Sequence, residues 1–240
     1  MSKTRRSYIL RLIFRCITLL GCGALCYFAP RQFSVLEGLN FFTRFSVLHI
    51  LWVLWAADMF LQIIPIKNKL PLGSMKLFAQ RFKPIREKIN HEALRDYILT
   101  TTKAAYKVFI LWCGLIALIG ILYWLGLFGK TGLFMFSVTF YVCDLICVLI
   151  WCPFRLLMNT RCCTTCRIFN WDHLMMFSPM IFMGGFYAVS LVLMSIIAWL
   201  VWEVCIMMYP ERFWEFSNRA LQCSECTDKL CTQYCQKLRK

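Results

Sequence analysis

The chain has 240 residues, of which 60% are hydrophobic and only 16% are charged, and its mean hydropathy is +0.62. This composition is too apolar for a soluble globular domain or a disordered chain. The net charge of +15 does not indicate nucleic-acid binding, because the lysines and arginines lie between the apolar runs, where they orient a protein in a membrane.

The apolar runs have the length of membrane-spanning helices. They predict an all-α fold, a polytopic transmembrane helical bundle with five to six membrane segments in the lipid bilayer. The expected segments are about 8–29, 45–65, 105–128, 133–154 and a longer run, 174–209. Only the tetrapeptide 129–132 separates the third segment from the fourth, so these two should form a tight antiparallel hairpin.

The last apolar run is too long for one crossing. Its 36 residues would form a straight helix of about 54 Å, against a hydrocarbon core of about 30 Å. Ser178-Pro179 and Gly184-Gly185 are typical helix breakers. We therefore expect a broken or re-entrant segment: a short entering piece followed by a full span.

A polar, basic segment, 66–104, lies between the second and third spans. Its later part, from Pro84, alternates charged and apolar residues at helical spacing and predicts an interfacial helix. The N-terminus, this segment with Lys107, and the loop 155–173 hold 5, 10 and 3 basic residues, against 3 on the opposite side. The positive-inside rule then predicts a multi-pass cell-membrane protein with a cytoplasmic N-terminus and a cytoplasmic C-terminus.

On this topology, residues 1–210 form one transmembrane domain and residues 211–240 form a Cys-rich C-terminal tail. A cysteine-rich loop after the fourth span shares the cytoplasmic face with the tail. Two Cys-x-x-Cys pairs, Cys163/Cys166 and Cys223/Cys226, supply four thiolates, the number that completes a tetrahedral metal site. Further candidate ligands are Cys162, Cys231 and Cys235. The site would tie the loop to the tail, and without a metal the same residues would be plain thiols or, outside the cell, disulfides.

The cofactor is an iron–sulfur cluster or Zn²⁺, and the spacing leaves both open. With a cluster, the protein would act in membrane-associated electron transfer, and an acidic soluble electron donor would dock on the basic 66–104 segment. With zinc, it would be a structural or assembly protein without a redox role that anchors a cytoplasmic partner. An ion or proton carrier that uses buried carboxylates is the second alternative, and no enzyme activity is assigned.

Four ionisable side chains fall inside the predicted spans: Arg15, Asp58, Asp144 and Glu203. Each is costly in lipid and should face the bundle interior. Arg15 and Asp58 lie at the same depth, which predicts an ion pair between the first two spans. Asp144 and Glu203 have no expected basic partner, and the carrier hypothesis would use these two carboxylates together with Asp58.

The cysteines within the spans are interpreted as small packing residues. Cys152, next to Pro153 at the cytoplasmic end of the fourth span, is the one among them kept as an additional candidate ligand. Trp171 is expected to anchor a helix end at the membrane interface, and His173 to be a polar interface residue.

Overall fold

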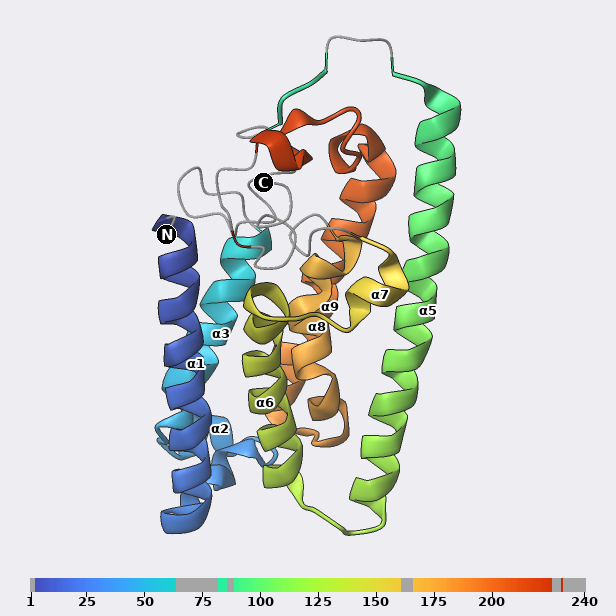
Figure 1. Ribbon diagram of the computed structural model, residues 1–240. Helices are drawn as coiled ribbons and strands as arrows, with labels where there is room; N and C mark the ends of the chain where they lie inside the picture. The colour runs from blue at the N-terminus through green and yellow to red at the C-terminus, as the bar shows by residue number, and fades with distance from the viewer. Residues whose placement is uncertain (1–2, 64–81, 86–88, 161–165, 226–229, 231–240) are drawn as a thin grey trace.

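The computed structural model describes residues 3–63, 82–85, 89–160, 166–225 and 230 (Figure 1). Its α-helices are α1 (Lys3–Phe28), α2 (Asn40–Thr43), α3 (Leu48–Ile63), α5 (His91–Trp124), α6 (Lys130–Leu149), α7 (Phe154–Met158), α8 (Asp172–Phe177) and α9 (Gly185–Met208). Its 3-10 helices are η1 (Pro30–Leu36), η3 (Arg167–Trp171), η4 (Ser178–Phe182), η5 (Pro210–Phe213), η6 (Arg219–Leu221) and η7 (Cys223–Glu225). An isolated bridge between Pro84 and Asn218 is the one β-type pairing among these residues, and the predicted helical bundle is confirmed.

Within the described residues, four helices are long and apolar enough to cross a membrane: α1, α5, α6 and α9. They contain 26, 34, 20 and 24 residues, and α3 adds a shorter apolar helix of 16 residues. Because a helix rises about 1.5 Å per residue, 20 residues match the hydrocarbon thickness of a bilayer. The helices therefore indicate a membrane protein.

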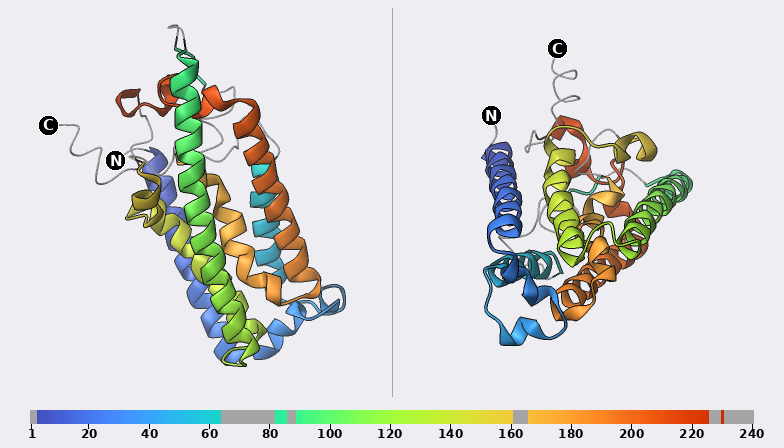
Figure 2. Two further views of the ribbon diagram at one scale, coloured as in Figure 1. Left: turned by 90° about the vertical axis from the view of Figure 1, so that its right-hand side faces the viewer. Right: turned by 90° about the horizontal axis from the view of Figure 1, so that it is seen from below.

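The helices run alternately up and down, as Figures 1 and 2 show. The first turn of α1 and the last turn of α9 lie at the same end of the bundle, and the turn at Gly184 lies at the other end. α1 packs along α6, and α3 packs along α9. α1 and α8, which are distant in sequence, both pack against α6.

The core is built from large aromatic side chains that interlock between α3, α6, α8 and α9. The ring centroid of Trp55 lies 5.1 Å from that of Phe177 and 5.9 Å from that of Phe134. The ring centroid of Phe134 lies 6.1 Å from that of Tyr187. The hydroxyl of Tyr187 donates to the carbonyl of Leu48 at 3.1 Å. In lipid the outside is as apolar as the core, so such shape fit and hydrogen bonds decide the packing.

The long apolar run is broken where its sequence predicts. α8 ends at Phe177, Pro179 lies in the short 3-10 helix η4, and the chain reverses at Gly184 and Gly185, whose φ angles are +63° and +82°. Only glycine adopts such angles without strain. The turn also packs closely, because the amide of Phe186 donates to the carbonyl of Gly38 at 2.9 Å.

Replacing Gly185 by alanine should therefore lower the free energy of unfolding by about 1–3 kcal/mol. A Cβ there would lie 2.8 Å from the carbonyl oxygen of Leu36 and 2.9 Å from the amide nitrogen of Gly38. Gly23→Ala is the matched control, since a Cβ added at Gly23 would have no neighbour within 4 Å and alanine favours a helix. Thermal unfolding in detergent measures both, and an equal midpoint for the two variants would contradict the prediction.

The separate interfacial helix predicted from Pro84 is not observed. Residues 91–104 instead form the first turns of α5, which continues without interruption to Trp124. The Asn90 side chain accepts from the amides of Glu92 and Ala93 and starts the helix there, and no proline follows to end it. The predicted surface helix and the predicted third span are thus one element.

Candidate functional site

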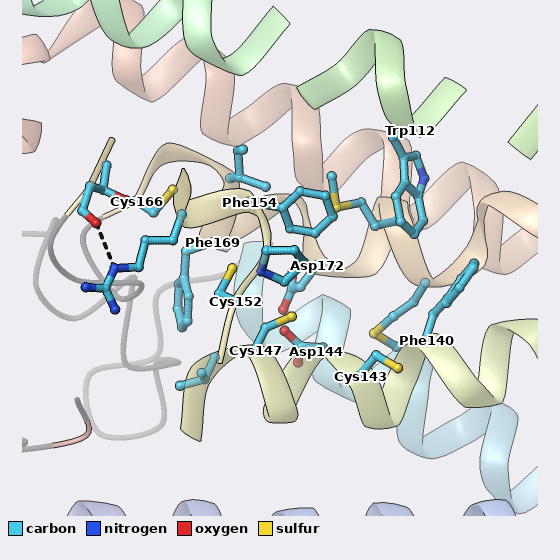
Figure 3. Close-up of a pocket in the computed structure, with 17 residues that line it drawn as sticks. Trp112, Phe140, Cys143, Asp144, Cys147, Cys152, Phe154, Cys166, Phe169 and Asp172 are labelled. Atoms are coloured by element: carbon cyan, nitrogen blue, oxygen red, sulfur yellow. Dashed lines mark hydrogen bonds between the residues drawn. The ribbon is translucent and has the colours of Figure 1, made fainter. Parts of the chain in front are cut away.

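A cavity of about 230 Å³ lies between α5, α6, α7 and α8 and is lined by sulfur-containing and aromatic side chains (Figure 3). The sulfur side chains in its wall are Cys143, Cys147, Cys152, Cys166, Met175 and Met176. They come from α6, from the turn after it, from the residue before η3, and from α8. We call this space the sulfur cavity.

Two of these thiols lie next to each other because of how α6 ends. α6 stops at Leu149, and the amide of Trp151 still bonds the carbonyl of Ile146 at 3.1 Å, so the chain curls back at the helix end. Pro153 cannot continue the helix. Cys152 is thereby turned towards Cys147, and the two side chains share a hydrogen bond.

The rest of the wall is mainly apolar and also contains charged side chains. Figure 3 shows the rings of Trp112, Phe140, Phe154 and Phe169 around the thiols. Arg155 also lines the cavity and donates from Nε to the carbonyl of Thr160 at 3.0 Å. Asp144 and Asp172 complete the lining. An apolar wall of this kind strengthens any electrostatic or metal–ligand interaction inside it.

The predicted metal ligands are only partly within the described residues. Cys166 lines the sulfur cavity, whereas Cys223 lies in η7 and is exposed. The other predicted ligands lie outside the described residues: Cys162, Cys163, Cys226, Cys231 and Cys235. Within the ranges that the structure describes, no three His, Cys, Asp or Glu side chains are grouped closely enough to hold a metal ion. The four-thiolate site therefore stays a prediction.

The cysteines of the fourth span, Cys143, Cys147 and Cys152, line one cavity. Cys143 and Cys147 are four residues apart on α6, so both thiols reach the same cavity, and Cys152 joins them from the turn. Their helical spacing, followed by Cys152-Pro153, is the signal in the sequence that indicates a common face. All ten cysteines that the structure describes are thiols rather than disulfides.

The buried arginine pairs with a different carboxylate from the one predicted. Arg15 donates from Nη1 to Asp144 Oδ2 at 2.6 Å and to the carbonyl of Tyr141 at 2.6 Å, and its guanidinium lies 3.9 Å from the centroid of the Tyr141 ring. The predicted Arg15–Asp58 pair is wrong because α1 packs along α6 and presents Arg15 to that helix. Asp144, for which no partner was expected, has one.

Asp58 instead faces a histidine. Asp58 Oδ2 lies 3.4 Å from His173 Nε2, and Asp172 Oδ1 lies 3.0 Å from His173 Nδ1, so the ring lies between two carboxylates. Gln62 donates to Asp172 at 3.4 Å. Donation to both carboxylates requires a proton on each ring nitrogen, that is, an imidazolium. His173 is buried within the protein.

Glu203 is also paired. Its carboxylate accepts from Arg167 Nη2 and, at 2.8 Å, from the indole nitrogen of Trp171, while Arg167 Nη1 donates to Thr102 at 2.6 Å. Trp171 is buried against α5 and α9, so it does not serve only as an interface anchor. The carrier hypothesis assumed carboxylates without partners, and for Asp144 and Glu203 this assumption is wrong.

The sulfur cavity shares part of its wall with the buried charged side chains around Arg15 and Asp58. Asp144, Phe169 and Asp172 line the sulfur cavity and also a smaller polar cavity of about 40 Å³, which Arg15, Asp58 and further polar side chains enclose. Comparison with known proteins adds no family or function, because no family model, no curated protein and no solved structure matches this chain.

Proposed function

We propose that this chain is a multi-pass membrane protein that binds a soft metal ion through cysteine sulfur in the sulfur cavity. One observation carries the proposal: six sulfur side chains from four segments of the chain line a single cavity. Thiolates and thioethers are the ligands that soft ions such as Cu⁺ and Zn²⁺ select in proteins. The proposal keeps cysteine ligation of a metal, shares Cys166 with the predicted site, and takes the other sulfur side chains from α6, the turn after it and α8.

The proposed topology has six crossings: α1, α3, α5, α6, the broken α8–η4 segment and α9. The end of the bundle at which α1 begins would face the cytoplasm. Basic side chains support this orientation, since Arg5, Arg6 and Arg95 lie in the helical turns near that end, whereas Arg31 and Lys130 lie near the other. The sulfur cavity would then belong to the cytoplasmic half of the bundle.

The identity of the predicted cofactor and its role remain separate predictions. A four-thiolate zinc site or iron–sulfur cluster would draw on Cys163 and Cys226, which lie outside the described residues. Electron transfer with an acidic soluble donor depends on such a cluster and on the basic 66–104 segment, most of which also lies outside them.

The test compares metal binding by the full-length protein and two cysteine variants, purified without oxygen and with all thiols reduced. Cys147→Ser/Cys152→Ser should lose one equivalent of bound metal by elemental analysis, because the adjacent thiols of the cavity are removed. The matched control, Cys26→Ser/Cys113→Ser, also removes two thiols, neither of which lines the cavity, and should bind as the wild type does.

A third variant, Cys223→Ser/Cys226→Ser, separates the cavity from the predicted four-thiolate site. If the protein binds a single equivalent of metal, and this equivalent disappears in this variant but persists in Cys147→Ser/Cys152→Ser, the ion belongs to the tail and the cavity proposal is overturned. Unchanged stoichiometry in Cys147→Ser/Cys152→Ser would overturn it too. Circular dichroism and gel filtration of each variant confirm that the helices are retained.

A further inference from the structure

The candidate metal donors in the sulfur cavity are all sulfur atoms. Four are thiols and two are thioethers, from Met175 and Met176, which are buried. No histidine lines the cavity among the described residues, and each of the two carboxylates in the wall already bonds a basic or amide group, Asp144 with Arg15 and Asp172 with His173 and Gln62. A wall with neutral thioethers and without imidazole favours the softest ions.

Among the described residues that line the cavity, two thiols lie close together, those of Cys147 and Cys152. Cys147 and Cys152 share a hydrogen bond, whereas Cys143 and Cys166 lie on either side of this pair in Figure 3. Structural Zn²⁺ requires four ligands in a tetrahedron. No group of even three metal-binding His, Cys, Asp or Glu side chains exists in the described part of the chain. Two thiolates alone therefore leave Zn²⁺ short of ligands, while a filled-shell monovalent ion accepts two.

The charge of a complex with a monovalent ion can be balanced by a basic side chain in the wall of the cavity. Two thiolates and one monovalent cation carry a net charge of −1 in an apolar cavity, which needs a compensating positive group nearby. Arg155 lies in the wall and is oriented by its bond to Thr160. Aromatic rings in the wall give the pair an apolar surrounding, which favours binding of an ion with few ligands.

Resting on the proposed function, we propose that the sulfur cavity selects a monovalent soft cation, Cu⁺, held by the thiolates of Cys147 and Cys152 with the thioethers of Met175 and Met176 as weaker neutral donors. Binding breaks two S–H bonds and forms two S–Cu bonds. It releases two protons to solvent and transfers no electrons, so copper enters and leaves as Cu⁺.

The experiment uses the full-length protein in detergent, titrated without oxygen with Cu⁺ and, in parallel, with Ag⁺ as a monovalent ion that does not change oxidation state. Each variant is compared with the wild type, so that ions bound by cysteines elsewhere cancel. We expect Cys147→Ser/Cys152→Ser to bind one equivalent less than the wild type in each titration, Cu⁺ or Ag⁺. The release of about two protons that accompanies binding of that ion should also be lost. Co²⁺, a spectroscopic substitute for Zn²⁺, should give the same thiolate absorption in both proteins.

The thioethers are tested by Met175→Leu/Met176→Leu, a nearly volume-conserving change that leaves every thiol in place. This variant should bind the cavity Cu⁺, the ion that Cys147→Ser/Cys152→Ser loses, with about tenfold or more lower affinity. This is the effect expected of supporting donors. Met135→Leu/Met194→Leu changes two methionines that do not line the cavity and serves as the control. X-ray absorption at the copper edge should show sulfur neighbours only.

The outcomes separate this inference from the proposed function. If no metal ion depends on Cys147 and Cys152, both fail. If Co²⁺ or Zn²⁺ occupies the site through these two cysteines with a four-ligand shell, the protein still binds a soft metal there and the choice of a monovalent ion is wrong. If Met175→Leu/Met176→Leu binds Cu⁺ as tightly as wild type, the thioether donors are overturned.

Discussion

Replacing Asp144 by alanine is expected to lower the free energy of unfolding by about 3–5 kcal/mol, because it leaves the charge of Arg15 buried without its counter-ion. The side chains of Arg15 and Asp144 are only 10% and 18% exposed. Arg15 would retain the Tyr141 carbonyl and ring, which offset part of the loss but carry no full negative charge. Reversible unfolding in mixed micelles, followed by circular dichroism, measures the change.

A pair on the surface of the same molecule gives the matched control. Lys83 and Glu225 lie 3.2 Å apart with side chains 64% and 35% exposed. Glu225→Gln should cost no more than about 0.5 kcal/mol, since water screens the pair. The double variant Arg15→Met/Asp144→Leu should recover most of the stability lost in Asp144→Ala, because no charge remains buried. An Asp144→Ala protein as stable as wild type would show that Arg15 is solvated or neutralised elsewhere.

The parts of the fold that depend on local sequence were predictable. The breaks at Pro179 and Gly184-Gly185 follow from backbone chemistry that acts within one or two residues, and the four long apolar helices follow from composition. The sequence does not predict that residues 91–104 and the third span form one continuous helix. Alternating charge at helical spacing indicates a helix but does not show where the helix ends.

The partners of the buried charges were not predictable in the same way. Position along the spans predicts equal depth for Arg15 and Asp58, whereas in the structure the guanidinium of Arg15 bonds Asp144. Which carboxylate it meets depends on the rotation of α1 and on its neighbour, and α1 packs along α6. Rotation is set by packing between helices, for which one apolar sequence holds little information.

The sulfur cavity was hidden for a related reason. Cys143 and Cys147 show their common face through helical spacing, but Met175 and Met176 lie in a later segment that only the turn of α8 against α6 brings to the same wall. Cys152 faces Cys147 because the helix ends between them. Tertiary contacts of this kind are absent from the spacing of cysteines along the chain.

The second large effect is expected at Glu203, which holds η3 against α9. Glu203→Ala should cost about 3–5 kcal/mol, since it leaves Arg167 with a charge in a site where its side chain is 14% exposed. Glu203→Gln keeps an acceptor for the indole of Trp171 and should cost about 1–3 kcal/mol. Unfolding in mixed micelles gives both values, and hydrogen exchange of the peptide 166–171 shows where the structure loosens.

The same variants test whether the Glu203–Arg167 ion pair affects metal binding in the sulfur cavity. Cys166 precedes η3 directly, and Phe169 within η3 lines the sulfur cavity, so release of Arg167 should let this wall move. Glu203→Ala should therefore raise exchange in 166–171 and weaken metal binding about tenfold, although Glu203 itself does not line the cavity. Faster exchange with unchanged metal affinity would show that the ion pair of Glu203 with Arg167 does not position the metal donors on α6, its turn and α8.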